Sequence, residues 1–115
     1  MARTQSAGGT TVSSGVKETW IMPAVTRLGD VCTGHGCFPP RVNDEASTDV
    51  FVNGIGVHRQ GDHWVTHCCG PSCHDGSLQT GSSSVYVNGI PAARIGDPIS
   101  CGSISAQGSP SVFFG

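Results

Sequence analysis

The chain contains an internal repeat, and this repeat limits its fold more than any other feature of the sequence. The segment VFVNGIGVHRQGD at 50–62 returns as VYVNGIPAARIGD at 85–97, and a shorter copy, PAVTRLGD, stands at 23–30. The last aspartates of the three copies are Asp30, Asp62 and Asp97, at spacings of 32 and 35 residues. Such spacings are typical of a supersecondary unit copied in tandem.

Each full copy has the pattern of a β-hairpin. The runs at 50–52 and 85–87 are β-branched and aromatic, and each leads into Asn-Gly, a strong hairpin signal because both turn residues need positive φ. The run VFF at 112–114 resembles the first strand of a further hairpin, whose second strand would be the copy at 23–30. No segment offers ten residues at helical period without Gly or Pro. The sequence therefore predicts an all-β fold of three hairpin repeats around a pseudo-three-fold axis.

Residues 1–21 differ from the repeats, because they are rich in Ser, Thr and Gly and have little periodicity. We expect 1–21 to be a flexible or partner-dependent N-terminal extension and 22–115 to form one compact domain. With 37% hydrophobic and 6% aromatic residues, that domain can build only a small core. Small cores usually need a metal, disulfides or a partner.

Charge and hydropathy exclude several classes of partner. Charged residues are 12% of the chain, the net charge is −2, and no Lys/Arg cluster supplies the basic patch that nucleic acid or an anionic membrane requires. No apolar stretch reaches membrane-spanning length and the N-terminus lacks a signal-peptide pattern, so we expect cytoplasmic synthesis and no stable membrane insertion. In a reducing compartment, the six cysteines favour metal ligands or free thiols over a disulfide framework.

Every copy of the repeat ends in Arg-x-Gly-Asp, at Arg27–Asp30, Arg59–Asp62 and Arg94–Asp97. A charged functional site is one interpretation of this motif. Its recurrence favours a structural one, in which each arginine and aspartate tie strand to loop through a hydrogen-bonded ion pair.

Good zinc ligands follow the repeat aspartates. His35 and His67 each lie five residues after an aspartate, and Cys101 lies four residues after the last one. Repeat-equivalent positions can converge on one axis, and a structural zinc needs four nitrogen or sulfur ligands. His74 is the best fourth ligand because Gly70–Pro71 can turn the chain back toward the axis. We therefore predict a closed metal site that stabilises the fold and leaves no open position for catalysis.

Other groupings of the same residue types stay open at this point. Cys69 and Cys73 could share a zinc ion with His74, or Cys32 and Cys37 could close a small disulfide. Neither grouping uses the three-fold register of the repeat.

An enzyme is a further alternative, and the sequence argues against it. His63 and His67 have the spacing of the metalloprotease His-x-x-x-His motif, but Trp64 stands where the glutamate base would be. The carboxylates outside the repeats form no recognisable motif with the histidines, so a zinc-dependent hydrolase is disfavoured.

The segment VNGIPAARIGDPISCG at 87–102, with GHGCFPPR at 34–41 and GSPSVFFG at 108–115, resembles the PAAR-repeat proteins, and the resemblance covers nearly all of 22–115. In that family a short cone of β-hairpins sits on the trimeric β-helical spike of a phage tail or a type VI secretion system. Three histidines and a cysteine bind a zinc ion near its point. The resemblance implies that these ligands are His35, His67, His74 and Cys101.

The resemblance also implies a mechanical function. The protein would cap the spike, with one chain for each trimeric spike protein, and help to pierce the target envelope without being an enzyme. It would act at the tip of the injection apparatus or virion and be delivered into the target cell. Relatives of this family bear extra domains, so an adaptor that recruits toxin effectors to the spike is the alternative function.

Overall fold

The computed structural model describes residues 22–115, and the prediction for residues 1–21 lies outside this range. Throughout the described part, the regular secondary structure is β-strand and no helix occurs, which confirms the predicted all-β fold. No helix there could therefore span a membrane. The strands form three antiparallel pairs, β2 (Phe51–Val52) with β3 (Ile55–Gly56), β4 (His63–Cys69) with β5 (Ser72–Ser77), and β6 (Tyr86–Val87) with β7 (Ile90–Pro91).

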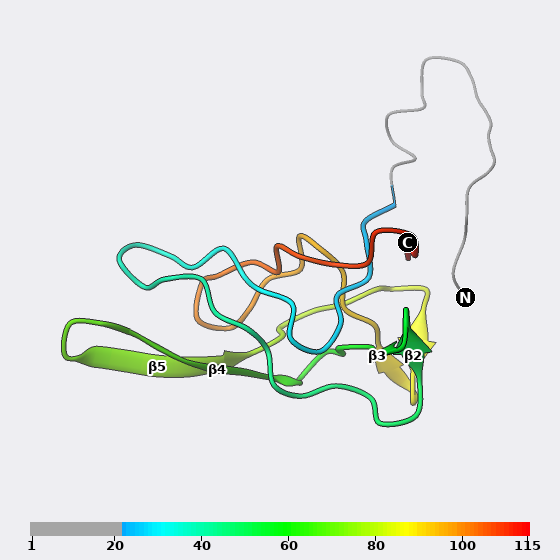
Figure 1. The fold of residues 1–115 in the computed structure, drawn as a ribbon, viewed down its shortest axis with the longest axis horizontal. Helices are drawn as coiled ribbons and strands as arrows, with labels where there is room; N and C mark the ends of the chain where they lie inside the picture. Colours follow the sequence, from blue (N-terminus) through cyan, green and yellow to red (C-terminus); the bar gives the residue numbers. More distant parts are fainter. Residues whose placement is uncertain (1–21) are drawn as a thin grey trace, which may run out of the picture.

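The strand pairs divide the molecule into two ends. The long β4–β5 hairpin reaches one end, and β2, β3 and the C-terminus lie at the opposite end (Figure 1). The β4–β5 hairpin lies between the second and third copies of the repeat, and the corresponding segments after the first and third copies pair only through isolated antiparallel bridges, such as Val31 with Val42 and Pro98 with Ile104.

The two Asn-Gly turns have the backbone that the sequence predicts. Asn53 and Asn88 have φ of 57° and 56°, and the glycines after them, Gly54 and Gly89, have φ of 77° and 75°. Positive φ at both turn positions matches the right-handed twist of the flanking strands, which is why Asn-Gly is favoured there. The register pairs the residues on either side of each turn, in β2–β3 and again in β6–β7.

The third hairpin is assembled from the two ends of the described chain. Ala24 forms an antiparallel bridge with Phe113, and the Val25 amide donates to the Val112 carbonyl at 3.1 Å. The predicted pairing between the run at 112–114 and the first copy of the repeat is therefore confirmed.

The three returning segments pair with one another in a ring. The amide of Thr26 donates to the carbonyl of Ala93 at 3.0 Å, Ala93 donates to His58 at 2.9 Å, and His58 donates to Thr26 at 3.1 Å. These residues precede the arginine in each copy, and the side chains of Thr26 and His58 are fully buried, as is Ala93. The cyclic pairing is the pseudo-three-fold arrangement that the repeat predicts.

The repeated Arg-x-Gly-Asp motif forms a buried structural link, and the structural interpretation is confirmed. Arg59 donates from Nε and Nη2 to the two carboxylate oxygens of Asp62 at 2.8 and 3.1 Å, and its own backbone amide donates to the same carboxylate at 3.0 Å. Arg27 with Asp30 and Arg94 with Asp97 repeat this bidentate contact. Bidentate, charge-assisted bonds of this kind fix the strand against the following loop.

Two apolar clusters follow from the alternation of the strands. In β2 and β6 the valines Val52 and Val87 point inward, whereas Phe51 and Tyr86 are 56% and 55% exposed. The first cluster, here the hairpin core, contains Val25, Val52, Val57, Val85, Val87, Ala92 and Phe114. The second, here the metal-side core, contains Cys32, Trp64, Leu78, Ala93 and Ile99, with Cys101 packed against it.

Candidate metal centre

Four side chains converge beside the metal-side core. One ligand atom from each of His35, His67, His74 and Cys101 lies within 4.8 Å of the other three. His67 is on β4 and His74 on β5, while His35 and Cys101 come from loops that follow two of the repeat aspartates. The structure thus brings together all four residues that the sequence singles out.

Local structure explains why the histidines face one point. His67 and His74 are direct cross-strand partners in the β4–β5 register, so their side chains share a face of the hairpin. Gly70, with φ of 62°, makes the turn between them. His35 sits in a tight loop, where its amide and carbonyl both bond to Phe38 at 3.0 and 2.8 Å. Gly34 has φ of 72° and lies against the backbone of that loop, which leaves no room for a side chain.

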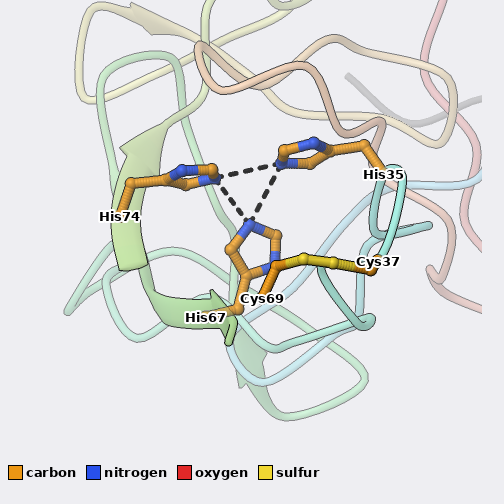
Figure 2. Close-up of a disulfide and its surroundings, with 5 residues drawn as sticks. All are labelled: His35, Cys37, His67, Cys69 and His74. Atoms are coloured by element: carbon orange, nitrogen blue, oxygen red, sulfur yellow. Dashed lines mark hydrogen bonds between the residues drawn. A yellow bond between two sulfur atoms is a disulfide. The ribbon is translucent and has the colours of Figure 1, made fainter. Parts of the chain in front are cut away.

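The three imidazoles meet through their Nε2 atoms (Figure 2). The Nε2 atom of His35 lies 3.2 Å from that of His67 and 3.0 Å from that of His74, and the last two are 2.9 Å apart. Around a tetrahedral zinc with Zn–N bonds of roughly 2.0–2.1 Å, ligand nitrogens stand about 3.3 Å apart. The nitrogen triangle is therefore close to one face of such a tetrahedron.

The surroundings of the triangle favour metal binding. The Nδ1 atom of His67 lies 2.8 Å from the Pro39 carbonyl, so Nδ1 carries the proton and donates it, which leaves the Nε2 lone pair free. The Phe38 ring packs against the three imidazoles, with centroids 4.3–5.0 Å away. This aromatic cover holds the rings and limits water at the site.

Two pKa shifts favour the metal-binding forms of the ligands. Burial, followed by the nearby His67, His74 and Arg41, lowers the pKa of His35, which favours its neutral imidazole. Burial raises the pKa of the Cys101 thiol, but hydrogen bonds from Ser103 and Arg41 outweigh that effect, so the net pKa is lowered. Thiolate sulfur and neutral imidazole nitrogen are the donors that a structural zinc takes.

The cysteines near the centre correct part of the sequence analysis. Cys37 is disulfide-bonded to Cys69, and Cys68 to Cys73, so the prediction of free thiols or metal ligands is wrong for these four. Both alternative groupings are wrong as well, because Cys32 is free and because Cys69 and Cys73, the proposed zinc ligands, are each held in a disulfide. Consecutive residues of a strand point to opposite faces, so Cys68 and Cys69 each meet a different partner.

The disulfides lie directly beside the histidines. Cys37 and Cys69 join the loop of His35 to β4, next to His67 (Figure 2). Cys68 and Cys73 are cross-strand partners in the β4–β5 hairpin. The two disulfides therefore tie together all three segments that carry the histidines.

His63 lies outside the centre. Its Nδ1 and Nε2 atoms contact the carboxylates of Asp44 and Asp75 at 2.6 and 3.0 Å, on an exposed surface. Hydrogen bonds to Asp75 and then Asp44 raise its pKa. The His-x-x-x-His spacing of His63 and His67 thus brings no pair of histidines together, in agreement with the argument against a metalloprotease.

Sequence reasoning missed two residues of this region, Phe38 and Arg41. Arg41 donates from Nη2 to the Cys101 sulfur at 3.2 Å. One signal could have identified it, because Arg41 is the only arginine or lysine of the sequence from 22 to 115 that does not belong to an Arg-x-Gly-Asp copy.

Comparison with known proteins places the chain in a family. The PAAR motif matches the chain over residues 3–106 and again over residues 74–115. No curated protein matches the chain. The two motif matches overlap and together cover almost the whole sequence, including every residue of the metal centre. The chain therefore belongs to the PAAR-motif family.

Proposed function

We propose that this protein is the zinc-stabilised tip that caps the trimeric β-helical spike of a contractile injection machine and helps it to pierce the target envelope. PAAR proteins are structural spike-tip proteins of secretion systems and phage tails, and they are not known as enzymes. One observation carries the proposal for this chain. A pseudo-three-fold layer of hairpins occupies one end, and a convergent group of three histidines and a cysteine lies beyond it, on the side of β4–β5.

The hairpin end is the proposed docking base. A trimeric β-helix ends in three equivalent strand edges, and uncovered edges attract unwanted pairing. One pseudo-three-fold monomer can cover all three edges at once by strand-like hydrogen bonding, so we propose one chain per spike trimer. Phe51 and Tyr86 occupy equivalent positions on two hairpins and are more than half exposed, as expected for side chains that a partner covers.

The metal is proposed to be a single structural zinc ion held by His35, His67, His74 and Cys101. When bound, zinc would supply four strong bonds that join the loop of His35, the β4–β5 hairpin and the loop of Cys101. Four such donors would complete a tetrahedron around zinc and would leave no position for a reacting water molecule, which supports a mechanical role. We further propose that the protein is made in the cytoplasm, assembles onto the spike there, and is delivered with it into the target cell.

Metal analysis of the purified protein tests the first half of the proposal. We expect one tightly held zinc ion per chain and loss of that ion in Cys101→Ser. A stoichiometry near zero, or of two or more ions, would contradict a single centre.

Light scattering of the protein mixed with its cognate spike tests the second half. The expected complex contains one chain and three spike chains. The double variant Phe51→Asp/Tyr86→Asp should abolish the complex, whereas Ile104→Asp, a matched exposed apolar position outside the hairpins, should leave it intact. A 3:3 complex, or equal binding by the two variants, would reject the docking base.

A further inference from the structure

Arg41 lies beside the metal-side core and is buried, at 7% exposure. Each nitrogen of its guanidinium donates to a defined acceptor. Nε donates to the Val65 carbonyl at 2.7 Å, Nη1 donates to the Cys32 sulfur at 3.1 Å, and Nη2 donates to the Cys101 sulfur at 3.2 Å. Its Cζ atom lies 5.6 Å from the centre of the Trp64 ring, within cation–π range. These contacts hold the guanidinium in a single orientation.

Arg41 differs from the other arginines in its partners. Arg27, Arg59 and Arg94 each pair with an aspartate, whereas no carboxylate within residues 22–115 forms an ion pair with Arg41. A buried cation is costly unless it is paired and hydrogen-bonded. Besides the Val65 carbonyl, its side-chain acceptors in this part of the chain are two cysteine sulfur atoms, and one of them belongs to the candidate metal centre.

Close packing keeps this contact short. A Cβ atom at Gly76 would stand 3.1 Å from Nη2 of Arg41, 3.4 Å from the sulfur of Cys101 and 2.9 Å from a methyl group of Ile99. Glycine on β5 therefore leaves room for the guanidinium to reach the sulfur.

We propose that Arg41 is a positioning residue of the metal centre, which holds the Cys101 sulfur in ligand orientation through an N–H···S hydrogen bond. Cys32 accepts the neighbouring N–H and anchors the guanidinium from the other side. The N–H···S bond also withdraws electron density from the thiolate and so tunes its bond to the metal. Outer contacts of this kind typically change metal affinity by roughly 10–100-fold. The inference rests on the proposed metal function.

Cobalt(II) binding tests the proposal, because thiolate-to-cobalt charge-transfer absorption reports the electron density on the sulfur. Arg41→Lys keeps the charge but cannot reach the Val65 carbonyl and both sulfurs together. We expect this variant to bind Co²⁺ about 10–100-fold more weakly, with its charge-transfer band at lower energy. Arg27→Lys, the same change at a hairpin ion pair, should alter neither property. Wild-type affinity and an unchanged band in Arg41→Lys would overturn the proposal.

A measurement on the wild-type protein covers the case in which Arg41→Lys does not fold. In protein loaded with ¹¹³Cd²⁺, a proton–cadmium correlation through the N–H···S bond should connect the metal to a guanidinium proton of Arg41. Correlations that reach backbone amides alone would overturn the proposal. If the wild-type protein binds none of Zn²⁺, Co²⁺ and Cd²⁺, the metal function itself fails. Binding that does not depend on Arg41 removes the positioning role alone.

Discussion

The hairpin end of the molecule contains β2, β3, β6 and β7, and the metal end contains β4, β5 and the candidate metal centre. The two ends are stabilised in different ways, although both derive from the same repeat. At the hairpin end the copies preserve the same contacts. The hydroxyls of Ser47, Ser82 and Ser109 accept the amide of the residue three positions later at 3.0, 2.8 and 2.9 Å, and the three arginine–aspartate pairs also recur. This end also has the larger apolar cluster.

At the metal end the repetition breaks down. The equivalent segments carry His35, His67 and Cys101, and the longer β4–β5 hairpin adds His74 and the cysteines Cys68, Cys69 and Cys73 of the two disulfides. The metal-side core is small but holds the largest fully buried apolar side chains, those of Trp64, Leu78 and Ile99, and two disulfides lie beside it. The contacts of the repeat are therefore preserved at the hairpin end, and the residues of the repeat are altered where they converge on the candidate metal centre.

Metal removal should have the largest effect and should separate the two ends most clearly. If the metal is present at about a thousand times its dissociation constant, its removal costs about 4 kcal/mol. For a domain of this size, each kcal/mol lowers Tm by roughly 4–8 °C. Calorimetry with and without a chelator checks this expectation. An unchanged Tm would show that a bound metal adds no stability at this end.

Removal of a disulfide should have the next largest effect on the free energy of unfolding, and the two disulfides should differ in this cost. Cys37→Ala/Cys69→Ala opens a link with a sequence separation of 32 and should cost between about 3 and 4 kcal/mol. Cys68→Ala/Cys73→Ala opens one with a separation of 5 and should cost about 2 kcal/mol. Guanidinium unfolding of the metal-loaded variants measures both values. Equal costs would argue against the loop-closure account.

Loss of an arginine–aspartate pair at the hairpin end should lower the free energy of unfolding without changing the metal affinity. Asp62→Ala removes a carboxylate whose side chain is 6% exposed and leaves Arg59 without its partner, so we expect a loss of about 3 kcal/mol. Asp97→Ala is the matched variant in another copy and should cost a similar amount. Chelator competition should give an unchanged metal affinity in both variants. Weaker metal binding would mean that the two ends are energetically coupled.

The smallest expected effect is the pH dependence of stability that comes from two histidines outside the metal centre, whose pKa values are shifted in opposite directions. Burial lowers the pKa of His58, whose Nε2 atom has no hydrogen-bond partner within the described residues. The stability linked to neutral His58 is present above its unfolded pKa of about 6.5 and is lost as pH falls through its folded pKa.

His63 should show the reverse behaviour, since hydrogen bonds to Asp75 and Asp44 raise its pKa. Its contribution is complete below a pH of about 6.5 and is lost as pH rises through its folded pKa. Because His63 is exposed, the effect on stability should be small. NMR titration of the imidazole C–H signals of the metal-loaded protein measures both directions, and a His58 pKa above that of His63 would refute this expectation.

Short-range features of the sequence determined the repeated framework and the candidate ligand group. Asn53–Gly54 and Asn88–Gly89 specify their turns locally, because few residues accept positive φ. The position of a residue with metal-binding chemistry after each repeat aspartate was sufficient to single out His35, His67 and Cys101, since equivalent positions in a closed ring face a common axis.

Tertiary structure alone decided the contacts that surround this group. Six cysteines allow many pairings, and only the β4–β5 register places Cys68 opposite Cys73 and leaves Cys69 facing the loop of Cys37. The sequence alone likewise does not predict that Arg41 is buried. It meets Cys32 and Cys101 only because the loop after the first copy packs against β4, which buries the guanidinium between segments distant in the chain. The physical reason is that these contacts depend on long-range register, which spacing along the sequence does not encode.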